Sequence, residues 1–376
     1  MEQMKIITVA GARPNFMKIK PFLKAVSAHN DRVNSAQEQI TALLVHTGQH
    51  YDENMSEIFF VELGLRTPDI NLGVGSGSHA KQTAHIMMGF EKICESEKPD
   101  WVVVVGDVNS TMACSLVCAK MGIRIAHIEA GLRSFDRTMP EEVNRIVTDA
   151  LADLLLTPSA DADQNLLHEG VPREKIRLVG NIMVDSLVDN LEQARSSDIM
   201  TELELSSGEF IYVTLHRPSN VDDKSSLTAI MKELERIALR LPVVFPVHPR
   251  ARKMITEFDL LPQRDYSIRL LDPIGYLASL CLTEKARLVL TDSGGLQEES
   301  TYFRTPCLTL RPSTERPITI SMGSNRLTRI ESLFGDVSEA LDGPSRKGQI
   351  PPLWDGRTAE RILGCIFEAQ SIKHIA

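Results

Sequence analysis

The segment LVLTDSGGLQEESTYF, residues 288–303, is the stretch from which the fold is predicted, because it reads as a buried apolar strand followed directly by a helix. The strand is expected to stop at Asp292, after which the chain turns through Ser293, Gly294 and Gly295. Glycines leave room for a ligand, and the free N–H groups at a helix start bind anions. The segment therefore predicts either a phosphate site or an ordinary turn in which Ser293 caps the helix.

Two carboxylates, Glu298 and Glu299, follow one turn into the expected helix. A carboxylate repels a nearby diphosphate, but it accepts hydrogen bonds from the hydroxyl groups of a ribose. A phosphate and a ribose beside the same helix start together indicate a nucleotide.

Short apolar runs alternate with helical patterns along the chain, which is typical of parallel sheets covered by helices on both faces. In the first half the predicted strands are residues 6–10, 42–46, 101–106, 123–128 and 154–157. After Gly180 the pattern restarts, with strands at residues 210–214, 243–247, 268–271, 288–291 and 307–310. We therefore predict an α/β protein with two Rossmann-like domains, residues 1–180 and 181–356.

Length, charge and hydropathy exclude several classes of protein. The 376 residues suffice for two domains, and a net charge of −9 without any Lys/Arg run argues against a nucleic-acid partner. The N-terminus leads directly into a strand without a signal peptide, and no apolar run approaches the roughly 20 residues of a membrane span. We expect a cytoplasmic protein with no membrane partner.

Motifs for cofactors and metals are absent from the sequence. Neither GxGxxG nor GxxxxGK occurs, so no dinucleotide or triphosphate fingerprint is present. Cys114 and Cys118 share a helix face, but the six cysteines are otherwise scattered without the spacing of metal ligands. We predict no metal site and no cofactor.

Ligands of open parallel sheets bind beyond the carboxyl ends of the strands. Nearly every predicted strand ends in a polar or ionisable residue, and we expect one cleft between the two domains to collect them. The residues at these ends are Arg13, Lys18, Asp107, Glu129 and Arg133 in the first half, and His216, Arg217, His248 and the SGG turn in the second half.

The segment HIEAGLRSFDRTMPEEVNRIVTD, residues 127–149, adds acidic groups to this edge. Glu129 follows a strand, and Glu141 and Glu142 start a helix where the macrodipole favours negative charge. Carboxylates that converge with Asp107 raise one another's pKa, which provides a general acid and a general base near neutral pH. The alternative is a purely structural network in which Arg133 and Arg145 neutralise these acids.

Nine motifs in sequence order resemble the non-hydrolysing UDP-N-acetylglucosamine 2-epimerases, from residue 5 to residue 363. They are GARPNFMK, TGQHYD, GDVNST, HIEAGLR, MPEEVNR, VTLHRPSN, PVHPR, TDSGGLQEE and TERP. The resemblance implies the glycosyltransferase-B arrangement with the active site in the inter-domain cleft, a C-terminal helix at residues 357–376 that packs back on the first domain, and a homodimer. It also implies a cofactor-free inversion at C2 that interconverts UDP-GlcNAc and UDP-ManNAc through elimination and re-addition of UDP.

The resemblance assigns roles residue by residue. It implies Asp107, Glu129 and Glu141 as catalytic acids, with the order of acid and base left open, together with Lys18 and His216. The implied phosphate site is Ser293, Gly294 and Gly295, with Glu299 on the ribose, Arg316 nearby and the uracil near residues 271–276, beginning at Leu271. Arg13, Arg133 and Arg145 complete the implied UDP-sugar site.

The sequence departs from the best-known bacterial members at two motifs. Gln49 and His50 are followed by Tyr51 and Asp52 where those members read QHR, and LHRPS stands where they read GHRRE or AHRRE. Gln49, His50 and His248 are the residues of a possible allosteric site. The alternatives are a 2-epimerase of another UDP-sugar, such as a diacetamido uronic acid, a hydrolysing epimerase, a glycosyltransferase and a non-catalytic sensor.

Overall fold

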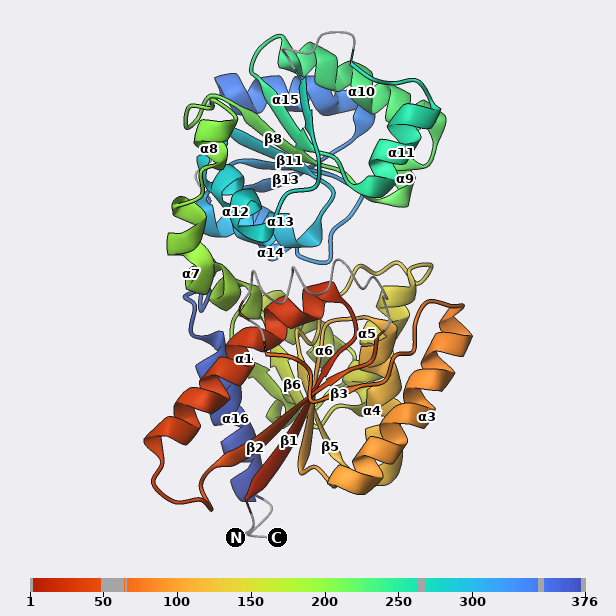
Figure 1. Ribbon diagram of the computed structural model, residues 1–376, viewed down its shortest axis with the longest axis vertical. Coiled ribbons are helices and arrows are strands. Elements are labelled where there is room, and N and C mark those ends of the chain that lie inside the picture. Colours follow the sequence, from red (N-terminus) through yellow and green to blue (C-terminus); the bar gives the residue numbers. More distant parts are fainter. Residues whose placement is uncertain (1–2, 49–63, 65, 263–267, 344–347, 373–376) are drawn as a thin grey trace. The chain divides into compact units, whose positions relative to one another are not determined.

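Two compact units make up the chain, and each contains one parallel sheet (Figure 1). The computed structural model describes residues 3–48, 64, 66–262, 268–343 and 348–372. The first unit comprises Met1–Ser186 with Pro352–Ala376, and the second comprises Leu187–Pro351. The prediction of an α/β protein with two Rossmann-like domains is confirmed. The units divide at Ser186, whereas the sequence placed the boundary at residue 180.

The first sheet has the strand order β3-β2-β1-β4-β5-β6-β7, and all of its pairs are parallel. Its strand order changes direction between β1 and β4, which is where such folds bind ligands. The strands are β1 Met4–Ala10, β2 Ile40–His46, β3 Ile70–Asn71, β4 Trp101–Val105, β5 Arg124–Ile128, β6 Leu154–Thr157 and β7 Ile176–Leu178.

Helices cover both faces of the first sheet (Figure 1). On one face α1 (Arg13–Arg32) packs beside the C-terminal helix α16 (Thr358–Ile372). The other face buries an apolar layer that includes Val102 and Val104 of β4 with Phe90. The helices of this layer are α3 His79–Glu97, α4 Asn109–Met121, α5 Pro140–Leu151 and α6 Ala160–His168. A 3-10 turn, η1 Arg173–Lys175, precedes β7, and α7 Ile182–Arg195 leads into the second unit.

The start of α16 is held on the first unit by a buried carboxylate. Asp185 accepts hydrogen bonds from the backbone N–H groups of Thr358 (3.0 Å) and Ala359 (2.7 Å), which have no partner inside their own helix. Trp354 donates its indole N–H to the carbonyl oxygen of Pro158 at 3.1 Å. The chain thus returns from the second unit to pack its last helix on the first.

The second sheet has the order β10-β9-β8-β11-β12-β13 and is again parallel throughout its described pairs. Its strands are β8 Ile211–Thr214, β9 Val243–Pro246, β10 Ile268–Leu271, β11 Leu288–Thr291, β12 Cys307–Leu310 and β13 Asn325–Thr328. Its helices are α8 Ile199–Glu202, α9 Pro218–Val221, α10 Lys224–Ala238, α11 Pro249–Glu257, α12 Tyr276–Lys285, α13 Gly294–Phe303, α14 Ile318–Ser321, η2 Ile330–Ser332 and α15 Leu333–Asp342.

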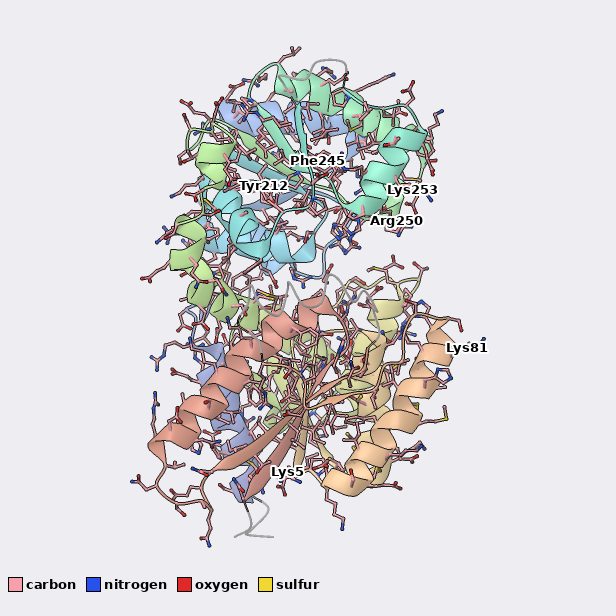
Figure 2. The ribbon with its side chains drawn as sticks, in the orientation of Figure 1. Lys5, Lys81, Tyr212, Phe245, Arg250 and Lys253 are labelled. Atoms are coloured by element: carbon pink, nitrogen blue, oxygen red, sulfur yellow. The ribbon has the colours of Figure 1, made fainter. Side chains whose placement is uncertain are left out.

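Alternate side chains of these strands enter two different apolar layers. Ile211 and Phe245 pack in the layer of α10, α11 and α15, while Tyr212 packs in the layer of α8, α12 and α13. Figure 2 shows Tyr212 and Phe245 inside this unit, and Arg250 and Lys253 on α11. Burial on both faces explains why the strands read as continuous apolar runs.

The helices of the described ranges give no candidate for a membrane crossing, because none is both long and apolar enough. All six cysteines are free thiols, and five of them are buried.

We predict that Asp185→Ala lowers the free energy of unfolding by about 1–2 kcal/mol, because the first N–H groups of α16 lose their acceptor. Urea unfolding of the purified variant measures this change. The control is Glu368→Ala, an exposed position on the same helix, which should change stability by under about 0.5 kcal/mol. Equal losses in the two variants would contradict the capping role.

Candidate active site

The start of α13 in the second unit forms the SGG turn. β11 ends at Thr291, and Ser293, Gly294 and Gly295 are half-buried at the beginning of the helix. The first N–H groups of a helix lack partners within it and carry partial positive charge. A Cβ atom on Gly294 would lie 2.6 Å from Nη1 of Arg316, so only glycine lets this guanidinium approach the helix start.

Carboxylates hold Arg316 in this place. Its Nε lies 2.8 Å from Oε1 of Glu298, and its Nη1 lies 2.5 Å from Oε1 of Glu315. Glu315 also pairs with Arg311 at 2.8 Å. Burial alone would raise the pKa of Glu315, but the charges of Arg316 and Arg311 lower it far below its ordinary value. The guanidinium is therefore held beside the SGG turn.

Asp292 joins the end of β11 to the loop that follows β8. Its buried carboxylate accepts the backbone N–H groups of His216 (3.1 Å) and Arg217 (2.9 Å) and the side-chain amide of Asn220 (2.9 Å). It also lies 2.9 Å from Nδ1 of His216, whose side chain remains 44% exposed. With Nδ1 held in this way, Nε2 is the ring nitrogen of His216 that a ligand can reach.

Sequence reasoning treated Asp292 only as the end of a strand and missed this organising role. Burial alone would raise the pKa of Asp292, but the hydrogen bond and charge of His216 lower it below its ordinary value. The signal available in the sequence was an ionisable residue between an apolar strand and two glycines. The ring of His248 lies 6.0 Å from that of His216, so this possible allosteric residue neighbours the same turn.

A buried acid lies further along α13. Glu299 is 7% exposed, and burial together with the neighbouring charge of Glu298 raises its pKa to about 8. The hydroxyl of Tyr276, at the start of α12, adjoins this acid, and burial together with the charge of Glu299 raises the pKa of the phenol well above its ordinary value. Leu271, where the uracil was expected, is half-buried at the end of β10.

A buried ion pair occupies the carboxyl edge of the first sheet. Nζ of Lys18, on α1, lies 2.5 Å from Oε2 of Glu129, which directly follows β5. Gly106 stands at the end of β4 with φ +67°, and a Cβ atom there would lie 3.3 Å from the Lys18 Nζ. Glycine suits this position because it adopts positive φ without strain and leaves room for the lysine.

Glu129 is held in an unusual backbone conformation. Its φ is +69°, a left-handed value that costs a non-glycine residue about 1–3 kcal/mol and is concentrated at functional sites. Its Oε1 atom is buried and makes no hydrogen bond among the residues described. One carboxylate oxygen is therefore committed to Lys18, and the other has no partner in the described chain.

Asp107 and the start of α5 share one arginine. Arg145 pairs with Oδ2 of Asp107 and with Oε2 of Glu142, the latter at 2.7 Å. Asn144 donates its side-chain amide to the backbone oxygen of Asp107 at 2.8 Å. Glu141 is exposed in the first turn of the same helix. The predicted acids Asp107 and Glu129 thus follow neighbouring strands, and Glu141 lies on the helix whose Arg145 binds Asp107.

The sequence identified Glu142 only as an acid at a helix start. In the structure it is a buried acceptor of hydrogen bonds. It is 1% exposed and accepts the backbone N–H groups of Ser134 and Phe135, each at 2.9 Å. Burial alone would raise the pKa of Glu142, but the Ser134 hydrogen bond and the charge of Arg145 lower it below its ordinary value. Two adjacent glutamates therefore have different environments, which sequence alone does not distinguish.

Arg133 does not contact the predicted acids. It is 2% exposed, pairs with Asp149 at 2.7 Å and forms two hydrogen bonds of 2.7 Å with Glu169. Arg133 therefore neutralises Asp149 and Glu169 rather than the acids at the predicted site. Arg13 is the first residue of α1, and Gln49 and His50 lie outside the described residues.

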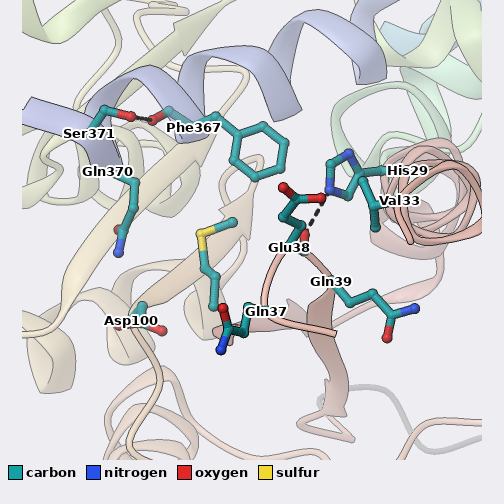
Figure 3. Close-up of a pocket in the computed structure, with 10 residues that line it drawn as sticks. His29, Val33, Gln37, Glu38, Gln39, Asp100, Phe367, Gln370 and Ser371 are labelled. Carbon is teal, nitrogen blue, oxygen red and sulfur yellow. Dashed lines mark hydrogen bonds between the residues drawn. The ribbon is translucent and has the colours of Figure 1, made fainter. Parts of the chain in front are cut away.

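A pocket of about 560 Å³ lies at the opposite, amino-terminal edge of the first sheet (Figure 3). Its lining includes Met4 at the start of β1, Asp100 before β4, and His29 with Phe367, whose rings are 4.8 Å apart. None of the predicted site residues lines it. The described part of the chain also contains no group of three or more His, Cys, Asp or Glu that could hold a metal ion.

The raised pKa of Glu299 makes stability depend on pH. The folded chain keeps a proton on Glu299 up to about pH 8, whereas the unfolded chain releases it near the ordinary value of 4.5. The free energy of unfolding therefore falls through this group as pH rises between these values. We predict that Glu299→Gln gains stability relative to the natural protein across this window, measured by urea unfolding at about pH 5 and about pH 9. If the unfolding free energies of Glu299→Gln and of the natural protein differ by the same amount at both pH values, folded Glu299 does not hold the proton.

Sequence comparisons match the chain over almost its full length. The family model described as UDP-N-acetylglucosamine 2-epimerase matches residues 32–367. The UDP-N-acetylglucosamine 2-epimerase of Methanococcus maripaludis is 39% identical over 372 residues, which cover 96% of this chain and 98% of that protein. The UDP-2,3-diacetamido-2,3-dideoxy-D-glucuronate 2-epimerase of Pseudomonas aeruginosa is 43% identical over 328 residues, which cover 86% of this chain and 88% of that protein.

A solved structure shares the fold. The UDP-GlcNAc 2-epimerase of Methanocaldococcus jannaschii, in complex with UDP-GlcNAc and UDP, superposes with a TM-score of 0.85 at 39% identity, covering 97% of this chain and 100% of that one. The resemblance noted from the motifs is confirmed, and the chain belongs to the UDP-N-acetylglucosamine 2-epimerase family.

Proposed function

We propose that this protein is a non-hydrolysing 2-epimerase that interconverts UDP-GlcNAc and UDP-ManNAc. The observation that carries the proposal is the buried Lys18–Glu129 pair, in which a strained glutamate keeps one oxygen without a partner among the described residues. An isomerase of this kind needs such a carboxylate at C2 of the sugar. The near full-length similarity to proteins named as UDP-GlcNAc 2-epimerases supports the same reaction.

The second unit is proposed to bind the UDP group. Ser293, Gly294 and Gly295 present the N–H groups of the helix start to the diphosphate, and Arg316 adds positive charge beside them. His216, held at Nδ1 by Asp292, donates from Nε2 to a phosphate oxygen when both of its ring nitrogens carry a proton. Glu299 accepts or donates hydrogen bonds at the ribose, and Leu271 lies near the base.

The proposed reaction is elimination followed by re-addition. A carboxylate takes the proton from C2, the C1–O bond to UDP breaks, and its electron pair leaves with the diphosphate, so that 2-acetamidoglucal and UDP remain bound. In the reverse sense a proton reaches C2 from the opposite face, and a diphosphate oxygen forms the C1–O bond again. Positive groups around the diphosphate stabilise the charge that develops there.

Three carboxylates of the first unit are proposed to move the protons. Glu129, with Lys18 stabilising its charged form, and Asp107, with Arg145 beside it, follow neighbouring strands. Glu141 is the third acid and is accessible at the start of α5. We propose Arg145 as the residue that orients Asp107, and Arg13 as a further cation of the substrate site. We also propose an allosteric site formed by Gln49, His50 and His248.

A second candidate substrate is a UDP-diacetamido uronic acid. The identity of 43% to an epimerase named for that sugar is as high as the identity to the relatives named for UDP-GlcNAc. The chemistry at C2 is the same for both sugars, because the elimination involves only C1 and C2. The two candidates differ in the groups at C3 and C5, which the substrate site must accept.

We also propose a homodimer, as the resemblance implied. Large apolar side chains are exposed in the first unit at Met88 (56%), Phe135 (78%) and Val143 (44%). Burial of such side chains between two copies would remove apolar surface from water. Light scattering of the pure protein gives the mass and decides between monomer and dimer.

Incubation with UDP-GlcNAc in D₂O tests the proposed function. Because the proton returned to C2 comes from solvent, we expect UDP-ManNAc with deuterium at C2, observed by proton NMR. A parallel incubation with the diacetamido uronic acid substrate identifies the preferred sugar. Free ManNAc with UDP would indicate a hydrolysing enzyme instead, and product that keeps its original C2 hydrogen would exclude elimination with solvent exchange.

We predict that substitutions separate chemistry from UDP binding. Glu129→Gln should lower kcat by about 100-fold or more, because a proton-transfer group is lost, while the Kd for UDP stays nearly unchanged. Glu299→Ala should weaken UDP binding by about 1–3 kcal/mol through lost hydrogen bonds to the ribose. Calorimetry with UDP and turnover assays measure the two effects. The reverse pattern would show that the nucleotide is assigned to the wrong unit.

A further inference from the structure

His127, the first residue of the HIEAGLR segment, has no role in the proposed chemistry, yet it lies on a central strand of the first sheet. It is completely buried on β5, between Val104 of β4 and Leu155 of β6. Its Nε2 lies 2.9 Å from the backbone oxygen of Gly106, and its Nδ1 lies 2.6 Å from Oδ1 of Asp149. Both ring nitrogens are therefore engaged.

The chemistry of these two partners defines what the ring donates. A backbone carbonyl only accepts hydrogen bonds, so the proton of this contact is on Nε2. A second proton lies between Nδ1 and the carboxylate, because two lone pairs at this separation would repel each other. The ring orientation is set by Asp149, and the Nε2–H group is thereby aimed at Gly106.

Asp149 is itself held by three residues of the HIEAGLR segment. Besides His127, it accepts the backbone N–H of Gly131 at 3.0 Å and pairs with Arg133 at 2.7 Å, and Arg133 in turn pairs with Glu169. Burial alone would raise the pKa of Asp149, but the charges of His127 and Arg133 lower it below its ordinary value. The His127–Asp149 pair is thus a buried, hydrogen-bonded anchor below the carboxyl edge of the sheet.

Three neighbours of this anchor adjoin proposed catalytic acids. Gly106 directly precedes Asp107, and Glu129 lies two residues after His127. Asp149 belongs to α5, the helix whose Arg145 and Asn144 bind the side chain and the backbone oxygen of Asp107. A shift of the imidazole would therefore move the Gly106–Asp107 turn relative to Glu129.

We propose that His127 is a positioning residue, which donates its Nε2–H to Gly106 under the control of Asp149 and so sets the distance between Asp107 and Glu129 without touching the substrate. This proposal rests on the proposed function, because Asp107 and Glu129 are its acid and base groups. In this proposal Asp149 orients His127, and Arg133 holds Asp149 in place.

Two substitutions separate the two hydrogen bonds of the ring. The side-chain amide nitrogen introduced by His127→Gln reaches about as far as Nε2 of the imidazole, so this variant keeps the donor to Gly106. The shorter amide introduced by His127→Asn reaches only to the place of Nδ1, so it keeps the contact with Asp149 and loses the donor to Gly106. His168→Asn, at an exposed position on α6, is the control for the substitution itself.

We expect His127→Asn to lower kcat by about 100-fold and His127→Gln by at most about tenfold, as a displacement of reacting groups by about 1 Å predicts. Thermal unfolding should show similar losses of stability for His127→Asn and His127→Gln, because each of these two variants removes one hydrogen bond of the ring. The Kd for UDP should not change, since the UDP groups belong to the other unit. Equal kcat in the two His127 variants, or a kcat that follows stability alone, would overturn the proposal.

A measurement on the natural protein needs no activity and uses His127→Gln only to assign the ring signal. In the ¹⁵N NMR spectrum of protein labelled at histidine, the His127 ring is identified as the signal absent from His127→Gln. A proton on its Nε2 that exchanges slowly with water supports the proposal, and an unprotonated Nε2 overturns it. If the natural protein turns over no UDP-sugar, the proposed function fails, while this spectrum still tests the hydrogen bond.

Discussion

The parallel alignment of the strands is the constraint on which the rest of this structure depends. Because every described strand pair runs in the same direction, the carboxyl ends of β1, β4 and β5 meet at one edge, as do those of β8 and β11. Loops at that edge leave the sheet at the start of a helix, where backbone N–H groups are unpaired. Charged side chains and unpaired backbone amides are therefore concentrated there, while both faces of each sheet are covered by apolar side chains.

The buried charged groups at these edges are tolerated because they are paired or hydrogen-bonded. In three ion-paired groups the partners shield each other from water. They are Lys18 with Glu129, Arg145 with Asp107, and Arg316 with two glutamates. Desolvation of an ion is costly, so a buried pair adds little net stability, and removal of one partner is strongly destabilising. Such pairs are expected where position matters more than stability. The left-handed backbone of Glu129 fits the same interpretation, since strain of this kind persists only where the surroundings enforce it.

The fold could be predicted from the sequence where the strands are buried on both faces. The central strands were predicted to within about two residues, because short continuous runs of Val, Ile and Leu between turn residues are typical of strands inside a parallel sheet. The strands β3, β7 and β13 were missed, and all three lie at sheet edges. An edge strand needs fewer apolar side chains and is short, with the polar sequence NRLT in β13 and only IN in β3. Periodicity cannot distinguish such segments from loops.

The sequence by itself determined the two α/β units, the family and most of the residues at the carboxyl edges, because each of these depends on local patterns or on motifs. Only the tertiary structure decided which of these residues face one another. It separated exposed Glu141 from buried Glu142, committed Arg133 to Asp149 and Glu169, and gave Asp292 and His127 their organising contacts. The physical reason is that burial and hydrogen bonding are set by residues far away in the chain, which no local pattern contains.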